Sequence, residues 1–282
     1  ADRRQRQMCI RDRLSTWIDA SPVSRFNSSP ADRPADIPVE LVEVLNGSRD
    51  LHRETQGAFD ITARPLMELW RLASGHEIAP SAEKLTAARA ASQWSHIQLT
   101  DGTLSKSLDT ASVDIDGIAK GYAIDRALAS IERSKAKGGM VDVGGDLRVF
   151  GQGPDSDIWT VAIRSPFEDL PWAEIELSEG AVCTSGDYAR FIEIGGQRYS
   201  HIIDPRSGRP TDRTHAVTVV GPDAASADAW ATALSVLGPS GLDLLADTRF
   251  EALVVTGDPD DYEVHSTPGF RDLLVRAAFE LR

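Results

Sequence analysis

The sequence predicts an α+β fold in which mixed or antiparallel sheets pack with helices. Predicted strands outnumber predicted helices, and neighbouring strands are often joined by short turns. No internal repeat, low-complexity tract or long linker divides the chain. A doubly wound parallel sheet would instead need a helix between successive strands, so that class is excluded.

The first part of the chain is predicted to be mainly helical. VELVEVLNGSRDLHR predicts a helix over residues 38–53, and a turn containing Gly57 leads to a second helix in which Pro65 suits a first position. A third helix follows the cap residue Ser81. SHIQL and GTLSKSL predict a hairpin, ASVDID at 111–116 predicts a strand, and residues 117–136 predict an amphipathic helix.

The second part is predicted to be mainly β. Two short strands flank Gly144 and Gly145, and an acidic turn at residues 258–261 joins the two strands of a later hairpin. A helix is predicted over 224–237 and another in GLDLLADT at 241–248. Further strands are expected in WTVAIRS, AEIELS, AVCTS, RFIEIGGQRYSHIID and HAVTVVG.

Composition restricts the class of protein. The 282 residues are 41% hydrophobic and 26% charged, which suffices for a full core. With 30 Lys and Arg against 43 Asp and Glu, the net charge of −13 argues against nucleic acid or an anionic membrane as partner. No apolar run approaches the roughly 20 residues of a transmembrane helix, and Cys9 and Cys183 set no disulfide or metal spacing.

We predict that residues 1–13 are non-native or disordered and that residues 14–282 form a single domain. The opening ADRRQRQMCIRDR is basic and patternless, unlike the acidic remainder, and QMCIRDR resembles translated adapter read-through. Recovery of these codons from a native open reading frame would refute this interpretation.

Asp228 and Thr232 lie four residues apart in AASADAWATALSVL, so a carboxylate and a hydroxyl share one helix face. Mg²⁺ prefers such oxygen donors and commonly keeps phosphate oxygens as further ligands. The pair predicts a metal-assisted phosphate site, although the same spacing also occurs on solvated helix faces.

Glycine and polar residues gather in two earlier segments. Gly57, Ala58 and Phe59 are predicted to form a turn that offers backbone amides and a ring to a ligand, or else a helix connection with Phe59 in the core. In VDIDGIAKGYAID, Asp114 and Asp116 end the predicted strand. The next helix opens over Gly117 to Gly121 with free amides near Lys120 that favour anions. The alternative is close helix packing with a solvated lysine, since no P-loop pattern is present.

Two later segments carry further polar residues. VDVGGDLRVFG predicts a tight turn with Asp142 and Asp146 as possible polar contacts. In the following segment His201 is the histidine best placed to take a proton from a hydroxyl, because it alone lies among other polar residues near strand ends. The alternative is a histidine with a purely structural role in a strand. Its companions there are Ser185, Asp187, Tyr188, Arg190, Asp204 and Arg206. No zinc spacing or serine-hydrolase elbow occurs.

Five ordered motifs over residues 14–275 resemble the ApbE family of bacterial FAD:protein FMN transferases. They are GAFDIT-x-x-PL-x-x-LW from Gly57, VDIDGIAKGYAID, VDVGGDLRV, TSGDY with RYSHIIDPRSGRP, and ADAWATALSVLG. The resemblance implies an ApbE-like fold and a Mg²⁺-dependent enzyme with FAD as substrate. It would move FMN to a threonine or serine hydroxyl of an acceptor flavoprotein and release AMP.

The resemblance also implies roles for particular residues. Mg²⁺ would be held by the Gly117 and Ala231 carbonyls and the Asp228 and Thr232 side chains. His201 would help to deprotonate the acceptor hydroxyl. The expected FAD contacts are Trp17, Gly57, Ala58, Phe59, Asp114, Lys120 and Ile203. For Trp17, a place in the core is the alternative.

The chain departs from the family pattern at three points. The usual N-terminal strand with a Met-Gly-Thr-like motif has no match, so we expect that strand to be missing. Asp116 and Cys183 stand where small residues are more usual. By resemblance we expect a location in the bacterial cell envelope, periplasmic or on the outer face of the inner membrane, where many relatives carry a lipid anchor.

Two other functions share the same residues. In a Mg²⁺-dependent FAD pyrophosphatase, water replaces the acceptor hydroxyl and free FMN is released. A non-catalytic FAD-binding protein would hold FAD without releasing AMP. The combination of Asp228, Thr232, Lys120 and His201 favours an enzyme, because storage needs no metal beside the pyrophosphate.

Overall fold

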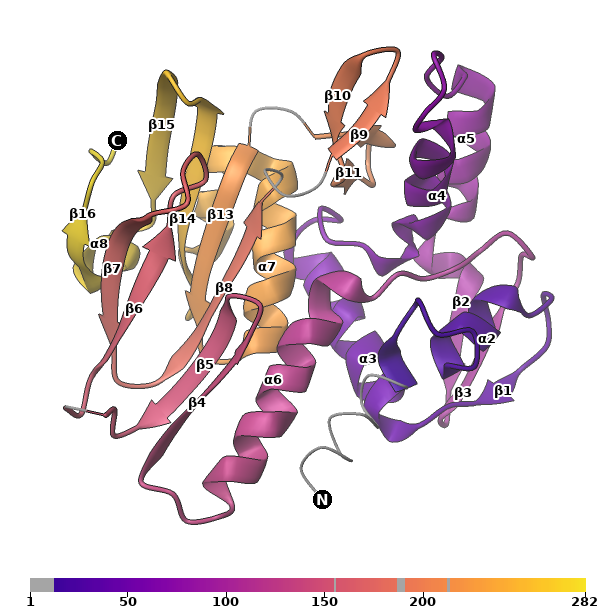
Figure 1. Ribbon diagram of the computed structural model, residues 1–282. Helices are drawn as coiled ribbons and strands as arrows, with labels where there is room; N and C mark the ends of the chain where they lie inside the picture. Colours follow the sequence, from indigo (N-terminus) through magenta and orange to yellow (C-terminus); the bar gives the residue numbers. More distant parts are fainter. Residues whose placement is uncertain (1–12, 155, 187–190, 212–213) are drawn as a thin grey trace. The chain divides into compact units, whose positions relative to one another are not determined.

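The computed structural model describes residues 13–154, 156–186, 191–211 and 214–282, and all strand pairs within them are antiparallel. The predicted α+β class is confirmed (Figure 1). The chain divides into two compact units. The first comprises residues 1–119 and 190–211, and the second comprises residues 120–189 and 212–282. The single domain predicted for residues 14–282 stays a prediction.

The first unit contains the first three helices predicted from the sequence. In α3 (Val39–Glu54), buried residues recur at helical spacing, from Leu41 through Val44 and Leu45 to Leu51, which explains why this segment is a helix. The Ser81 hydroxyl accepts the Lys84 amide at 3.3 Å and caps the third predicted helix, as expected. The other helices are α2 (Pro22–Ser28), α4 (Arg64–Ala73), α5 (Ala82–Ala91) and the 3-10 turns at Ile61–Ala63 and Trp94–His96.

Short antiparallel strands complete the first unit. The predicted hairpin is confirmed as β2 (Ile97–Thr100) and β3 (Thr103–Lys106), with β1 (Ala35–Asp36) on the other side of β3. Two small hairpins lie in the segment from residue 191: β9 (Phe191–Ile194) with β10 (Gln197–Ser200), and β11 (Ile203–Asp204) with β12 (Arg209–Pro210).

The second unit is built on a six-stranded sheet in the order β15-β14-β13-β8-β5-β4. Helix α7 (Ala224–Leu237) packs against β8 and β13 on one face, and the three-stranded sheet β16-β7-β6 packs on the other (Figure 1). Helix α6 (Asp116–Glu132) precedes β4. The strands are β4 (Gly138–Val143), β5 (Asp146–Gly151), β6 (Trp159–Arg164), β7 (Pro171–Leu177), β8 (Gly180–Gly186), β13 (Thr214–Gly221), β14 (Glu251–Asp258), β15 (Asp261–Ser266) and β16 (Leu274–Ala277).

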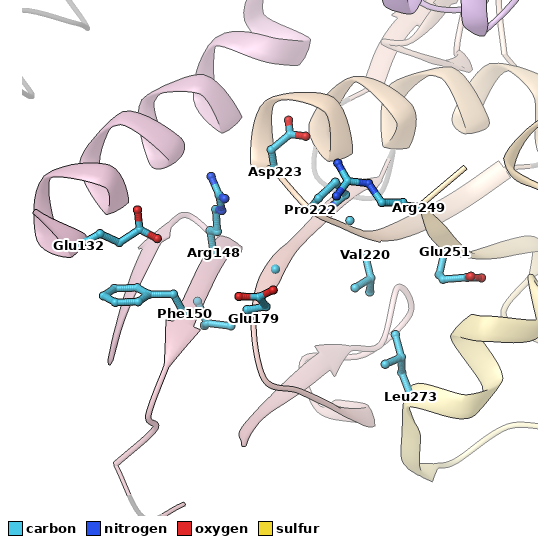
Figure 2. Close-up of a pocket in the computed structure, with 13 residues that line it drawn as sticks. Glu132, Arg148, Phe150, Glu179, Val220, Pro222, Asp223, Arg249, Glu251 and Leu273 are labelled. Atoms are coloured by element: carbon cyan, nitrogen blue, oxygen red, sulfur yellow. The ribbon is translucent and has the colours of Figure 1, made fainter. Parts of the chain in front are cut away.

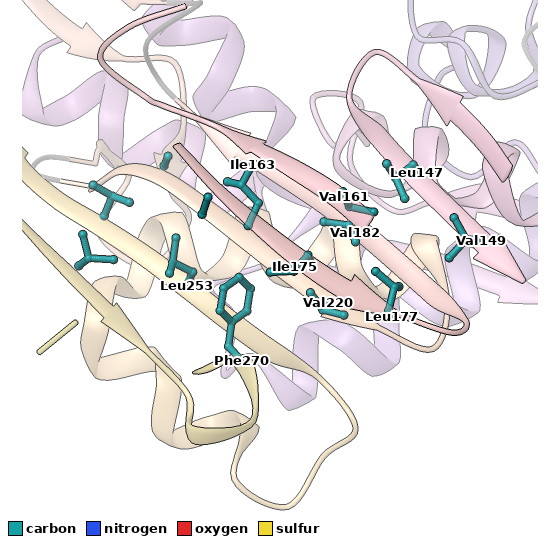
Figure 3. Packing of buried hydrophobic residues seen from close by; sticks show 14 residues of the cluster. Leu147, Val149, Val161, Ile163, Ile175, Leu177, Val182, Val220, Leu253 and Phe270 are labelled. Carbon is teal, nitrogen blue, oxygen red and sulfur yellow. The ribbon is translucent and has the colours of Figure 1, made fainter. Parts of the chain in front are cut away.

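The core between the two sheets follows from strand alternation. Val182 and Val220 point from the large sheet toward Val161 and Ile175 of the small one, and Phe270 of α8 (Pro268–Leu273) closes the cluster (Figure 3). Because neighbouring residues of a strand face opposite sides, Cys183 points the other way, and its thiol contacts the Ala224 carbonyl of α7 at 3.5 Å. The central strands β8 and β13 of the large sheet are therefore buried on both faces.

Two local predictions are wrong. Residues 111–115 form no strand and Asp116 opens α6, because the backbone bonds of the segment go elsewhere. The Asn27 side chain binds both the amide and the carbonyl of Val113, and the Asp114 amide binds the Ile61 carbonyl. The helix predicted at 241–248 is a 3-10 helix, Gly238–Leu245. Short elements such as α2, α8 and β16 were not predicted.

No helix among the described residues has the length and apolar character needed to cross a membrane. Most of the segment predicted to be non-native, residues 1–12, lies outside the described residues.

A buried lysine in the first unit gives a stability prediction. Lys106 is 1% exposed, and its ammonium donates to the carbonyls of Asn27, Asp109 and Ala111 at 2.8–2.9 Å. Replacement by methionine keeps most of the apolar stem of the side chain but removes the ammonium that pairs with the three carbonyls. We expect Lys106→Met to lower the free energy of unfolding by about 3 kcal/mol, measured by urea denaturation.

Lys84→Met, at an exposed position of α5, is the matched control and should change stability little. Equal free energies of unfolding for the two variants would show that the hydrogen bonds from the Lys106 ammonium to the three carbonyls do not stabilise the fold.

Candidate active site

The predicted site residues divide between the two units, and each group is described within its own unit. The first unit holds Trp17, Gly57, Ala58, Phe59, Asp114, Gly117, His201 and Ile203. The second holds Lys120, Asp228, Ala231 and Thr232.

The turn after α3 uses its backbone donors internally. Gly57 has φ of 79°, which favours glycine, and its amide donates to the His52 carbonyl at 2.8 Å. The Ala58 amide donates to the Thr55 carbonyl and the Phe59 amide to the Thr55 hydroxyl. The prediction of amides offered to a ligand is therefore wrong for this turn.

The side chains of the turn are also largely internal. Ala58 is 2% exposed and Phe59 4%, which agrees with the alternative of a core phenylalanine. The adjacent Asp60 lies 3.4 Å from the His52 ring, and burial raises the pKa of this carboxyl despite its bonds to Thr62 and the attraction of His52. A role of the turn in binding FAD stays a prediction.

Asp114 lies just before α6 and is mostly buried. Its Oδ1 accepts the amide of Asp116 at 2.9 Å, and Arg64 lies 4.0 Å from its other oxygen. Burial, with the negative charge of Asp116, raises the pKa of Asp114 to about 6. The carboxyl therefore carries its charge in neutral solution at a free-energy cost.

This raised pKa predicts a pH dependence of stability. The folded protein holds the Asp114 proton more tightly than the unfolded chain, whose carboxyl has the ordinary value of 3.8. Between these values the contribution of Asp114 to stability falls as pH rises, in total by about 3 kcal/mol. Asp114→Asn keeps the acceptor for the Asp116 amide and should remove this loss.

The measurement is urea unfolding from pH 4 to 8 in the presence of a chelator, with the exposed Asp19→Asn as control. Asp114→Asn should gain stability relative to the parent chain as pH rises, whereas Asp19→Asn should follow the parent. Parallel curves for all three proteins would contradict the raised pKa.

His201 and Ile203 lie beside the hairpins of the first unit. Ile203 is 6% exposed and packs with Leu66, Trp70 and Ile194, so most of its surface contacts protein. His201 is half-buried between β10 and β11. Of its predicted companions, Asp204 binds Arg206 at 2.9 Å, while Asp187, Tyr188 and Arg190 lie outside the described residues.

The second unit brings together a lysine and two carboxylates. The Lys120 ammonium lies 2.6 Å from Oδ2 of Asp146. Asp146 is 1% exposed, and its other oxygen, Oδ1, accepts the Thr184 amide at 2.9 Å. Burial alone would lower the pKa of Lys120, but the charges of Asp228 and Asp146 raise it. Lys120 is therefore a cation that is ion-paired with Asp146 and further stabilised by Asp228.

Asp228 lies on α7, where the helix meets α6. It is 7% exposed, and its Oδ2 accepts the Gly121 amide at 3.2 Å. The helices touch backbone to backbone, since a Cβ on Gly121 would lie 2.1 Å from the Ala224 carbonyl oxygen. The alternative of close helix packing is therefore confirmed for Gly121. The solvated lysine of the same alternative is not, because the Lys120 side chain is ion-paired with Asp146 and 38% exposed.

Thr232 follows Asp228 by one helical turn, so their side chains share a face of α7. The carbonyl of Ala231 accepts the Ser235 hydroxyl at 2.8 Å and would need to share or exchange this bond to ligate a metal.

Comparisons with known proteins match this chain over nearly its whole length. The model of the ApbE family matches residues 2–254. The chain belongs to the ApbE family.

Two relatives named FAD:protein FMN transferase illustrate the extent of the match. The one from Vibrio cholerae is 32% identical over 271 residues, 94% of this chain and 81% of the relative. The one from Escherichia coli is 31% identical over 272 residues, covering 93% and 78%.

Solved structures agree with the ApbE fold. The flavin transferase ApbE from Vibrio cholerae superposes with a TM-score of 0.84 at 30% identity over 97% of this chain and 90% of its own. The ApbE protein from Thermotoga maritima gives 0.87 at 27% identity over 98% and 92%.

Sequence reasoning missed one residue of this ApbE chain that orients α7. The Asp125 carboxylate accepts the amides of Ala224 and Ala225 at 2.9 Å and pairs with Arg148 at 2.7 Å. Together with the cap residue Asp223 it satisfies the first turn of the helix that carries Asp228. The sequence predicted only a polar contact for Asp146, not its ion pair with Lys120. The position of Asp146 directly after the Gly144–Gly145 turn is the one sequence feature that pointed to it.

A cavity of about 640 Å³ in the second unit does not coincide with the predicted ApbE site (Figure 2). None of the predicted site residues lines it. Its charged lining is mixed, with Arg148 and Arg249 among the acidic residues Glu132, Glu179, Asp223 and Glu251. Arg148 in this lining is already paired with Asp125, and the first three amides of α7 are bound by Asp125 and Asp223.

Proposed function

We propose that this chain is a Mg²⁺-dependent FAD:protein FMN transferase that acts on a threonine or serine of an acceptor flavoprotein. The similarity to transferases of that name over at least nine-tenths of the chain supports the activity. The observation that carries the chemistry is Lys120, ion-paired with Asp146 and influenced by the charge of Asp228. A lysine cation near a carboxylate that can ligate Mg²⁺ suits a pyrophosphate substrate.

In the proposed reaction the acceptor hydroxyl oxygen attacks the phosphorus of the FMN half of FAD. A new oxygen–phosphorus bond forms, the bond to the AMP phosphate oxygen breaks, and His201 accepts the hydroxyl proton. Lys120 offsets negative charge on the pyrophosphate, and the other contacts hold FAD in line for attack. In this reaction the nucleophile is the hydroxyl oxygen of a threonine or serine of the acceptor protein.

The donor set fits Mg²⁺ if hydroxyl, carbonyl and substrate oxygens contribute. No group of three or more His, Cys, Asp or Glu in the described parts of the chain could hold a metal. Asp228 and Thr232 provide two oxygen donors on one face of α7, and Gly117 and Ala231 are proposed to add carbonyls. When bound, Mg²⁺ would withdraw charge from the phosphates and stabilise AMP as leaving group.

We also propose that the chain acts in the bacterial cell envelope, outside the cytoplasmic membrane, on the strength of the family resemblance. Fractionation of the native host, with the protein followed by antibody, tests this location. Recovery in the cytoplasm would overturn it.

Incubation with FAD and Mg²⁺, with and without an acceptor flavoprotein, tests the activity. The expected result is an FMN-sized mass gain on the acceptor with an equal amount of AMP, and neither product when Mg²⁺ is chelated. AMP with free FMN and unmodified acceptor would identify a pyrophosphatase. Bound FAD without AMP, across several acceptors, would identify a binding protein.

A further inference from the structure

Trp17 presents an exposed aromatic ring from a loop that is fixed at both ends. The side chain is 74% exposed, whereas Leu14 before it is 3% exposed and Val23 after it is fully buried. Within the loop the Ser21 amide donates to the Ile18 carbonyl at 2.9 Å. A large apolar ring held in solvent on an anchored loop is typical of a surface that binds another flat group.

The ring is oriented by one carboxylate. The indole Nε1 of Trp17 donates to Oδ2 of Asp116 at 3.2 Å, and the hydroxyl of Thr16 donates to Oδ1 at 3.0 Å. Asp116 is itself fixed at the start of α6, where its amide binds Asp114. Each oxygen of Asp116 therefore holds one of two consecutive residues.

This arrangement fixes the edge of the indole and leaves its faces open. Bonds at the Nε1 edge restrict rotation of the side chain, and the Trp17 amide adds a bond to the Ser15 hydroxyl at 3.1 Å. Restricting the ring before binding reduces the entropy lost when a ligand stacks on it. A merely structural tryptophan would gain nothing from an exposed face.

We propose that Asp116 is a positioning residue that holds Trp17 ready to stack on a planar ring of FAD. The inference rests on the proposed function for the identity of the ligand. FAD carries two planar rings, the flavin and the adenine, and either could stack on an indole. Asp116 does not touch the ligand in this scheme and acts through Trp17.

The test is equilibrium binding of FAD to the full chain without acceptor, followed by flavin fluorescence. Trp17→Ala should raise the Kd for FAD about tenfold, as loss of one stacking partner does. Asp116→Ala should raise it about threefold, because the ring remains but is no longer held. Asp19→Ala removes an exposed carboxylate from the same segment and should leave the Kd unchanged.

A double-mutant cycle distinguishes positioning from other roles. If Asp116 acts through Trp17, adding Asp116→Ala to Trp17→Ala should weaken binding no further. Thr16→Val should reproduce part of the Asp116→Ala effect. Additive effects in the double variant, or an unchanged Kd in Trp17→Ala, would overturn the proposal, as would a change confined to the KM for the acceptor protein.

Binding of FMN and AMP separately identifies the stacked ring, because only the half that stacks should weaken in Trp17→Ala. The binding test is independent of transfer. A chain that binds FAD with this pattern of variants but moves no FMN would refute the proposed function alone. A chain that transfers FMN with the same FAD affinity in all variants would refute the positioning role alone.

Discussion

Replacing Asp228 by alanine is expected to abolish Mg²⁺-dependent transfer while leaving the fold nearly intact. The proposed metal loses its only carboxylate ligand, and metal stabilisation of phosphoryl transfer amounts to several kcal/mol, so the rate should fall about a thousandfold or more. The structural cost is smaller. The Gly121 amide loses an acceptor at 3.2 Å, worth about 1 kcal/mol, and Lys120 keeps Asp146.

Transfer should be measured as AMP release and acceptor mass over a range of Mg²⁺ concentrations, with urea unfolding as the control for folding. Asp247→Ala, an exposed acid of the same unit, should behave like the parent. Thr232→Ser keeps the hydroxyl and should be active, whereas Thr232→Val should require more Mg²⁺. Normal activity of Asp228→Ala would refute the proposed metal site.

Replacing His201 by asparagine is expected to lower the rate of transfer about a hundredfold to ten-thousandfold, the usual contribution of a general base. Asparagine retains hydrogen bonding but cannot take the proton of the acceptor hydroxyl at neutral pH. Because the proposed role lies in the proton transfer, the Kd for FAD should change little.

Single-turnover transfer and FAD binding should be measured on the same preparation of His201→Asn. His76→Asn, at an exposed position of the first unit, controls for a general effect of removing an imidazole. A variant that binds FAD poorly but transfers it at the normal rate once saturated would place His201 in binding and exclude the base.

Local pattern was sufficient for the regular elements. The apolar spacing of α3, the Ser81 cap of α5 and the glycine pair between β4 and β5 each act within a few residues, and all three predictions are confirmed. Periodicity failed at residues 111–115, where the side chain of Asn27 takes the place of a neighbouring strand. An alternating pattern cannot distinguish a strand from an extended segment that is bonded to side chains.

The family motifs identified candidate residues but not their partners. The sequence GIAKG is compatible with both anion binding and close helix packing. The proximity of the Ala224 carbonyl to Gly121 shows that this glycine permits close packing of the two helices. The turn at Gly57 was predicted to offer its backbone amides to a ligand, but these amides donate hydrogen bonds to His52 and Thr55. In both cases the deciding group lies outside the motif itself.

The sequence by itself determined the α+β class, membership of a flavin-transferase family, and the Asp228–Thr232 pair on one helix face. These depend on residues near one another along the chain or on ordered motifs. Only the tertiary structure decided that Lys120 meets Asp146, that Asp125 holds the start of α7, and that Asp116 holds Trp17, 99 residues away. Such contacts depend on how helices and strands pack, and local periodicity carries no information about that packing.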